Sequence, residues 1–347
     1  MKVKIALPLM AVVLLALACS LVGVEPAPLQ EPLPTETEAE PTTESPSTES
    51  EKRCGDGVCD GPENDDNCPQ DCPGEGESRP SVEDTSGEEH RVTNPATGVA
   101  LYVHVTTPDV ANTVMFPAVV LVPGGIGDSA GFRRPGAMAD VLAEAGYVTV
   151  VFDPDGRGES SGEEDYNGHA QQDGLAAVIE FAADLPQVDS DRLGLVSYSY
   201  GVTMASGALA RYPDLPILFY MDWEGPADRF DTTTDCTPNT RIDFAPCDDD
   251  AFWSQREALE FISEVQVPYQ RLQTENDHVQ PDVDHAVNMI YAAVQGDPPW
   301  VRLNDLDTNE RYDNDDPPAM IPEGDPRSLD QLTLDYVEEM FELHHKP

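Results

Sequence analysis

Short apolar runs alternate with amphipathic stretches over residues 88–347. The runs rich in β-branched residues, which are typical of buried strands, lie at 100–106, 116–122, 147–152, 193–196, 216–221, 269–273 and 300–303. Stretches with helical periodicity lie at 135–145, 172–183, 252–264, 283–294 and 329–343. Strands that alternate with helices in this way predict an α/β domain with a mostly parallel central sheet and helices on both faces.

The first 87 residues lack this pattern. A basic start, Met1–Lys4, precedes an apolar run that ends at residue 18, which predicts a secretory signal peptide over 1–18, too short to span a bilayer comfortably. The tetrapeptide Ala16–Cys19 resembles a bacterial lipobox, although Ala16 stands where leucine is usual, and it also fits a plain Ala-x-Ala cleavage site. The chain has seven cysteines, and lipidation of Cys19 leaves an even number for disulfides. We therefore expect an exported lipoprotein that faces the periplasm or the cell exterior, with the lipid as its only membrane contact.

Residues 19–53 are rich in Pro, Glu, Thr and Ser, a composition that cannot bury enough apolar surface to fold, so they predict a disordered tether. Residues 54–72 resemble a short acidic cysteine-rich module of secreted bacterial proteins. A module this small needs cross-links, and its four cysteines are expected to pair among themselves, with three connectivities open. They are Cys54, Cys59, Cys68 and Cys72. A polar linker follows at 73–87.

Carboxylates crowd this module. They are Asp56, Asp60, Glu63, Asp66 and Asp71. Their mutual repulsion would be relieved by a hard cation with oxygen ligands, which favours a Ca²⁺ site. The spacing does not match an EF-hand loop, and a disulfide knot with a solvated acidic rim explains the same residues.

The net charge of −47, from 66 acidic and 19 basic residues, excludes nucleic acid as a partner, because the surface repels phosphate backbones. Salt screens such repulsion, so this charge indicates either a saline habitat or simply a secreted acidic protein.

The strongest chemical motif is the segment 195–202, Leu-Val-Ser-Tyr-Ser-Tyr-Gly-Val. A buried strand runs into a small-x-Ser-x-Gly turn that precedes a helix, which is the pattern of a nucleophile elbow with Ser199 at its apex. Such a tight turn requires small residues two positions before and after the nucleophile, here Ser197 and Gly201. Ser197 replaces the more usual glycine. The Tyr200 amide is then placed to donate to an oxyanion.

Two further segments carry the same chemistry. Pro-Gly-Gly-Ile-Gly at 123–127 follows a strand, and its glycines allow close approach to a developing charge, so Gly125 or Ile126 is expected to supply the second oxyanion amide. After the strand at 269–273 comes Asp277 with Pro281 four residues later.

These segments, together with the loop at 152–162, resemble the α/β-hydrolase superfamily over residues 90–345, and Asp277 matches the triad acid of its dienelactone-hydrolase and esterase-like branches. The resemblance implies an α/β-hydrolase fold and ester or, less favoured, amide hydrolysis of a small molecule through an acyl-enzyme on Ser199. No organic cofactor is needed for that reaction.

The base is the difficulty. A serine needs one, and the order Ser, acid, His places it after the last strand, where no histidine occurs before His344 and His345. We expect His285, at the start of the helix after the acid, to serve. His278 is a weaker alternative, because a neighbour of the acid at a strand end usually points elsewhere, and so is His169, in a helix-entry loop on the same side. His344 or His345 would have to fold back from a chain end, and chain ends are usually mobile. If none serves, the domain is a catalytically degenerate surface binding protein.

Residues 222–267 interrupt the alternation where hydrolases of this fold carry a cap. Asp222, Trp223 and Glu224 open this region at a strand end and are expected to line the site, and Cys236 and Cys247 are expected to form a disulfide. The stapled segment is either a lid that selects the substrate or a surface loop.

Overall fold

The computed structural model describes residues 87–109, 115–233, 236, 245–280, 282–307 and 320–344, all within the compact unit Gly76–Pro347. The predicted signal peptide, Cys19, the tether, the cysteine-rich module with its carboxylates and nearly all of the linker lie outside the described residues.

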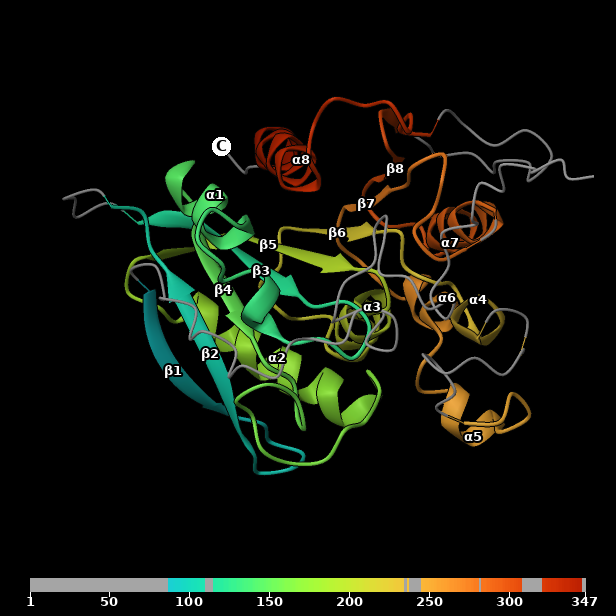
Figure 1. Cartoon of the computed structure of the whole chain (residues 1–347), viewed down its shortest axis with the longest axis horizontal. Helices are drawn as coiled ribbons and strands as arrows, with labels where there is room; N and C mark the ends of the chain where they lie inside the picture. The colour runs from blue at the N-terminus through green and yellow to red at the C-terminus, as the bar shows by residue number, and fades with distance from the viewer. Residues whose placement is uncertain are drawn as a thin grey trace, which may run out of the picture. The chain divides into compact units, whose positions relative to one another are not determined.

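A nine-stranded sheet forms the centre of this unit (Figure 1). Its strands are β1 (Gly87–Thr93), β2 (Ala100–Thr106), β3 (Phe116–Val122), β4 (Val148–Phe152), β5 (Val188–Tyr198), β6 (Phe219–Trp223), β7 (Tyr269–Leu272), β8 (Val301–Leu303) and β9 (Leu306–Asp307). The order is β1-β2-β4-β3-β5-β6-β7-β8-β9. Strands β4, β3, β5, β6, β7 and β8 are parallel, and antiparallel pairs close both edges. The carboxyl ends of the parallel strands therefore meet along one edge of the sheet.

Helices cover both faces of the sheet. They are α1 (Met138–Glu144), α2 (His169–Ala183), α3 (Gly201–Arg211), α4 (Arg229–Thr233), α5 (Asp250–Trp253), α6 (Ala258–Ile262), α7 (Asp284–Gln295) and α8 (Leu329–His344). One core cluster contains residues of α2, α3, α6 and α7, and the other contains residues of α1 and α8 (Figure 1). Within the described part of the chain, no helix combines the length and the apolar character needed to cross a bilayer.

Strand β3 shows why the sheet is buried on both sides. Ala118, Val120 and Val122 belong to one core cluster, whereas Val119 and Leu121 belong to the other. Successive side chains of a strand point to opposite faces, so a continuous apolar run is what a strand covered on both faces requires. The predicted α/β architecture, a mostly parallel central sheet with helices on both faces, is therefore confirmed.

The short elements β9 and α4 are absent from the sequence prediction, and two larger features also differ from it. Strand β1 was not predicted, because its sequence Gly-Glu-Glu-His-Arg-Val-Thr is polar and it pairs only at the edge of the sheet. The single helix expected at 252–264 is wrong, since α5 and α6 are separate. Between them Arg256 pairs with Asp165, and Glu257, extended at φ −112° and ψ 110°, pairs with Arg229. The backbone leaves the helical conformation here, and the side chains of both residues form these ion pairs.

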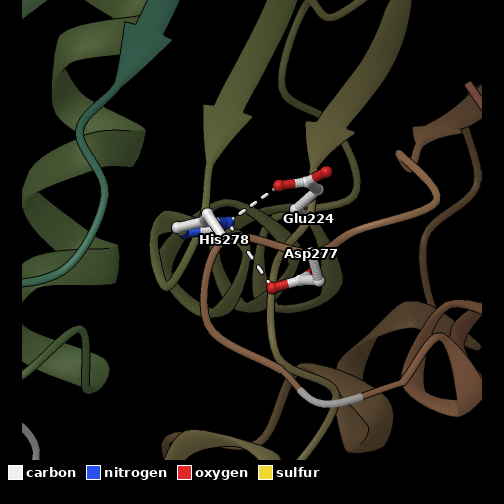
Figure 2. A group of neighbouring side chains, drawn as sticks. All are labelled: Glu224, Asp277 and His278. Carbon is white, nitrogen blue, oxygen red and sulfur yellow. Dashed lines mark hydrogen bonds and ion pairs between the residues drawn. The ribbon is translucent and has the colours of Figure 1, made fainter. Parts of the chain in front are cut away.

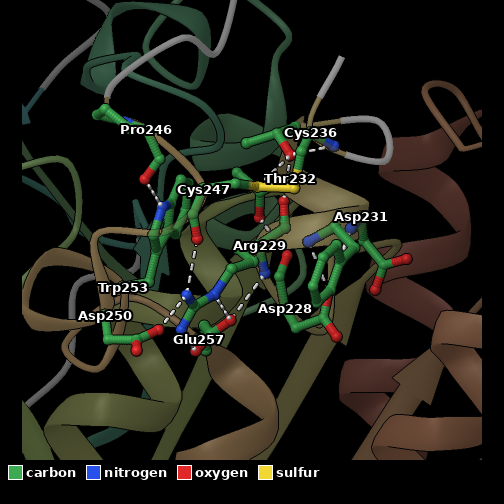
Figure 3. The surroundings of a disulfide bond; sticks show 12 residues. Asp228, Arg229, Asp231, Thr232, Cys236, Pro246, Cys247, Asp250, Trp253 and Glu257 are labelled. Carbon is green, nitrogen blue, oxygen red and sulfur yellow. Dashed lines mark hydrogen bonds and ion pairs between the residues drawn. A yellow bond between two sulfur atoms is a disulfide. The ribbon is translucent and has the colours of Figure 1, made fainter. Parts of the chain in front are cut away.

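The segment between β6 and β7 holds α4, α5 and α6 together with the predicted disulfide Cys236–Cys247, which is present in the structure (Figure 3). Arg229 organises this segment: its guanidinium donates to Glu257, to Asp250 and to the carbonyl oxygen of Cys247. The disulfide and this arginine therefore tie the same loop at two neighbouring points.

Replacing both cysteines by alanine should remove the entropic restraint of a loop that joins residues 11 apart, a loss of about 3 kcal/mol. For a domain of this size we expect the melting temperature to fall by roughly 6–10 °C. Calorimetry of the double variant beside the oxidised protein measures this, and the reduced wild-type protein is the control. Equal melting temperatures would show that the bridge contributes nothing.

Candidate active site

Ser199 lies at the apex of a sharp turn between β5 and α3. Its φ of 48° is in the left-handed region, which a non-glycine residue enters only at a strain cost, and such strain is concentrated at functional sites. Its amide donates to the Trp223 carbonyl at 2.7 Å. A Cβ on Gly201 would stand 2.6 Å from the Pro123 carbonyl oxygen, so only glycine fits there. The elbow predicted from the sequence is therefore the observed backbone.

Ser197, the departure from the usual glycine, is fully buried, and its hydroxyl hydrogen-bonds the Tyr220 hydroxyl of β6 at 2.9 Å. The small polar side chain is thus accommodated by a partner on the next strand, and the turn keeps its shape.

The imidazole of His278 faces Ser199. Its Nε2 lies 3.0 Å from the Ser199 Oγ, and its Nδ1 lies 2.8 Å from Glu224 Oε2. Figure 2 shows the Glu224 and Asp277 carboxylates converging on this ring. With Nδ1 protonated, Nε2 accepts the serine proton, so Ser199, His278 and Glu224 form a continuous hydrogen-bonded chain. This is the arrangement of a nucleophile, a base and an orienting acid.

Glu224 follows β6 directly and has a φ of 45°. Its amide donates to the Leu272 carbonyl, and its Oε1 accepts from the Thr274 amide and hydroxyl, which leaves Oε2 for His278. Burial opposes ionisation, but the hydrogen bonds from His278 and Thr274 outweigh it and lower the pKa of the Glu224 carboxyl. The carboxylate is therefore held charged beside the imidazole.

The His278 side chain is 47% exposed. Its partial burial disfavours the imidazolium, but the hydrogen bond to Glu224 and the charges of Asp277 and Glu224 reverse that effect and raise its pKa above the ordinary value. The ring is thus a stronger base than free histidine.

Asp277, the expected acid, has a fully buried side chain and shapes the turn that carries His278. Its Oδ1 accepts the amides of Val279 and Gln280, both at 2.8 Å, and its Oδ2 accepts Gln273 Nε2 at 2.9 Å. Burial raises the pKa of Asp277, but hydrogen bonds, first that of His285, lower it well below its usual range. It also lies 3.6 Å from His278 Nδ1, farther than Glu224.

Asp277 lies beside the histidine that contacts Ser199, and Gly124 of the loop after β3 lies against the Ser199 turn, whereas the contact that His285 makes is with Asp277. His285 is buried in α7, and its Nε2 lies 3.1 Å from Asp277 Oδ2. Helix packing points its ring at the far side of Asp277, so His278 occupies the position expected for His285. His169 opens α2, and its carbonyl accepts from Arg211; His344 ends α8 with its ring against Trp300. His345 lies outside the described residues.

Of the three residues expected to line the site, one reaches it. Glu224 does, whereas Asp222 is buried in an ion pair with Arg271 and the Trp223 indole donates to Thr333. Sequence reasoning missed Glu224 as the partner of a histidine. The available signal was a carboxylate directly after the strand that neighbours the nucleophile strand.

The loop after β3 lies against the elbow. A Cβ on Gly124 would stand 2.9 Å from the Tyr198 carbonyl oxygen and 3.0 Å from the Ser199 Cβ, so this backbone needs glycine to approach the serine. Gly127 donates to the Gly124 carbonyl at 2.9 Å, which closes a turn with Gly125 and Ile126 at its centre. At the other side, the Ser199 carbonyl accepts from Val202, so the peptide that carries the Tyr200 amide is aligned with the first turn of α3.

Glu224, Asp277 and His278 offer ligand atoms within 4.8 Å of one another, a spacing that would also suit a cation. Hydrogen bonds already satisfy these groups: Thr274 and His278 for Glu224, and four donors for Asp277. Hydrogen bonds therefore account for the close approach of these three side chains.

This sheet order, the serine on a strand-to-helix elbow and the histidine beside it define a protein of the α/β-hydrolase fold. The alpha/beta hydrolase fold family profile matches residues 117–215. Uncharacterized protein YcjY of Escherichia coli K12 is 30% identical over 118 residues, which cover 33% of this chain and 37% of that protein.

Solved structures agree on the fold. Dipeptidyl peptidase 4 of Porphyromonas gingivalis superposes with a TM-score of 0.57 at 18% identity, over 75% of this chain and 36% of that one. Acylaminoacyl peptidase of Pyrococcus horikoshii gives a TM-score of 0.56 at 16% identity, over 76% and 42%. The chain thus spans well under half the length of these proteins, and the likeness is one of fold.

Proposed function

We propose that this protein is a serine hydrolase that cleaves a small carboxylic ester, or less readily an amide, through an acyl-enzyme on Ser199. The observation that carries the proposal is the 3.0 Å contact between the Ser199 Oγ and His278 Nε2 on an elbow whose apex has a φ of 48°. In this proposal His278 is the base and Glu224 orients it, while Asp277 holds the turn between them.

The chemistry follows from these positions. The Ser199 oxygen attacks the ester carbonyl carbon while its proton passes to His278 Nε2, and the oxyanion faces the amides of Tyr200 and of Gly125 or Ile126. His278 then protonates the departing alkoxide, which leaves an acyl group on Ser199 and frees the alcohol. Water attacks the acyl carbon, loses a proton to His278 and releases the acid, after which the proton returns to Ser199.

The alternative, a degenerate binding protein, was based on the absence of a histidine after the last strand. His278 meets that need from the loop after β7, so the catalytic proposal is favoured over the binding one. The fold neighbours that are named peptidases add support for hydrolysis in general.

We further propose that the enzyme is exported and anchored in the cell envelope through a lipid on Cys19. Support for this comes from the first 19 residues and from the odd number of cysteines.

A fluorophosphonate probe tests the catalytic proposal. The full chain should become labelled, digestion and mass spectrometry should place the adduct on Ser199, and the Ser199→Ala variant should not react. A folded wild-type protein that stays unlabelled would instead support the binding alternative.

A further inference from the structure

The loop after β4 contains a buried arginine side chain, Arg157, that takes no part in the proposed reaction. Arg157 is 4% exposed, and its Nε and Nη2 pair with the Glu164 carboxylate at 2.7 and 2.8 Å. The same guanidinium reaches the turn after β3: Nη1 donates to the carbonyls of Gly125 at 3.3 Å and Gly127 at 3.5 Å. A buried arginine is thus bound to the turn that lies against Ser199.

Arg157 also reaches the other side of the elbow through one intermediate. Its Nη2 donates to Asn167 Oδ1 at 2.8 Å, and Asn167 Nδ2 donates to the Tyr200 carbonyl at 2.7 Å. Asn167 is fully buried and has a φ of 63°, a conformation that asparagine tolerates better than most residues. The chain of hydrogen bonds therefore links the turn after β3 to the start of α3.

The direction of a carbonyl group also determines the direction of the amide in the same peptide. In a trans peptide the C=O of one residue and the N–H of the next point in opposite directions. Because the Gly125 carbonyl is held by Arg157, the Ile126 amide points away from the guanidinium. The hydrogen bond on that carbonyl also polarises the peptide and makes its N–H a better donor. Of the two amides considered for the turn, Ile126 is thus the one whose direction Arg157 fixes.

We propose that Arg157 is the positioning residue of the oxyanion hole: it fixes the Ile126 amide directly and, through Asn167, it holds the carbonyl of Tyr200, the residue before α3 whose amide is the other expected donor. This inference rests on the proposed function. Its physical content is that an oxyanion hole acts only if its donors are in place before charge develops. Glu164 balances the charge, so the arginine orients the donors without itself touching the substrate.

Arg157→Met tests this with an activated ester such as a p-nitrophenyl ester. We expect kcat to fall by about 30- to 100-fold with KM changed less than threefold, because misplacing donors by about an ångström affects the transition state and spares ground-state binding. A trifluoromethyl ketone, which forms a tetrahedral adduct with its own oxyanion, should bind more weakly by the same factor. A purely structural role would not give this match.

Arg229→Met is the matched control, because Arg229 also pairs with a glutamate and donates to a backbone carbonyl, yet contacts the cap segment. It should keep kcat and the ketone affinity. If Arg157→Met does not fold, Asn167→Asp keeps an acceptor for Arg157 and removes the donor to Tyr200, and its kcat should fall about tenfold for the same reason.

The outcomes separate the two proposals. The role of Arg157 alone is overturned if wild-type turnover is lost in Ser199→Ala while kcat and ketone affinity are unchanged in Arg157→Met. If Arg157→Met does not fold, the same reading applies to Asn167→Asp. Turnover that survives in Ser199→Ala, or its absence from the wild type, overturns the proposed function and this inference with it.

Discussion

His278→Ala is expected to lower kcat/KM for an activated ester by about 10⁴, the upper range for the loss of a general base. The contact that predicts this is the one between His278 Nε2 and the Ser199 Oγ at 3.0 Å. Without the imidazole the serine proton has no acceptor, so a weak nucleophile remains. Steady-state kinetics and the rate of fluorophosphonate labelling measure the effect.

His285→Gln is the control for this experiment, since His285 is the histidine expected from the sequence and lies 3.1 Å from Asp277 on its other side. Its kcat/KM should stay within about tenfold of wild type, because His285 contacts Asp277 and not the reacting atoms, so that its loss affects mainly the stability of the fold. A large loss in His285→Gln together with an active His278→Ala would return the role of base to His285.

The contrast between these two histidines shows where sequence reasoning reached its limit. The elbow could be predicted because its signature lies within one short segment, 195–202, where a buried strand runs into a small-x-Ser-x-Gly turn before a helix. The base could not, because the direction of His278 depends on a turn. Asp277 accepts the amides of Val279 and Gln280, and this turn swings the next side chain toward the serine.

Glu224 shows the same limit for a different reason. Its place beside His278 depends on β6 and β7 being neighbours in the sheet, and on Thr274 holding its other oxygen. The sequence near residue 224 contains no pattern that predicts which strand lies beside β6. The carboxylate that contacts His278 Nδ1 at 2.8 Å follows the strand after the nucleophile strand, whereas the resemblance to known hydrolases pointed to the strand after that one.

The fold could be predicted where the apolar periodicity is strong. The prediction failed where polar contacts determine the path of the backbone. The run at 116–122 coincides with β3, because both faces of that strand are buried. In contrast, the break between α5 and α6 depends on Arg256 and Glu257, whose partners Asp165 and Arg229 are distant in sequence. Ion pairs of this kind carry no periodic signal.

The second prediction with a large expected effect on kcat/KM concerns Glu224, the carboxylate next to His278. Glu224→Gln should lower kcat/KM by about 10³, because an orienting acid that becomes neutral no longer holds the imidazole tautomer or stabilises the imidazolium. It should also change the pH profile. His278 must be neutral to act, and its pKa is raised, so the acid limb of kcat/KM in the wild type should have its midpoint above that of free histidine.

In Glu224→Gln the strongest cause of that raised pKa is removed, so the acid limb should move to lower pH, while the charge of Asp277, 3.6 Å from Nδ1, keeps part of the shift. Glu275→Gln is the matched control, since it removes an exposed carboxylate from the same loop and should leave both rate and midpoint unchanged. Asp277→Asn should mainly lower the melting temperature, because Asp277 accepts four hydrogen bonds that shape the turn. If instead Asp277→Asn, still folded, moves the acid limb further than Glu224→Gln and costs more in kcat, then Asp277 is the acid of the triad, as the strand position alone had suggested.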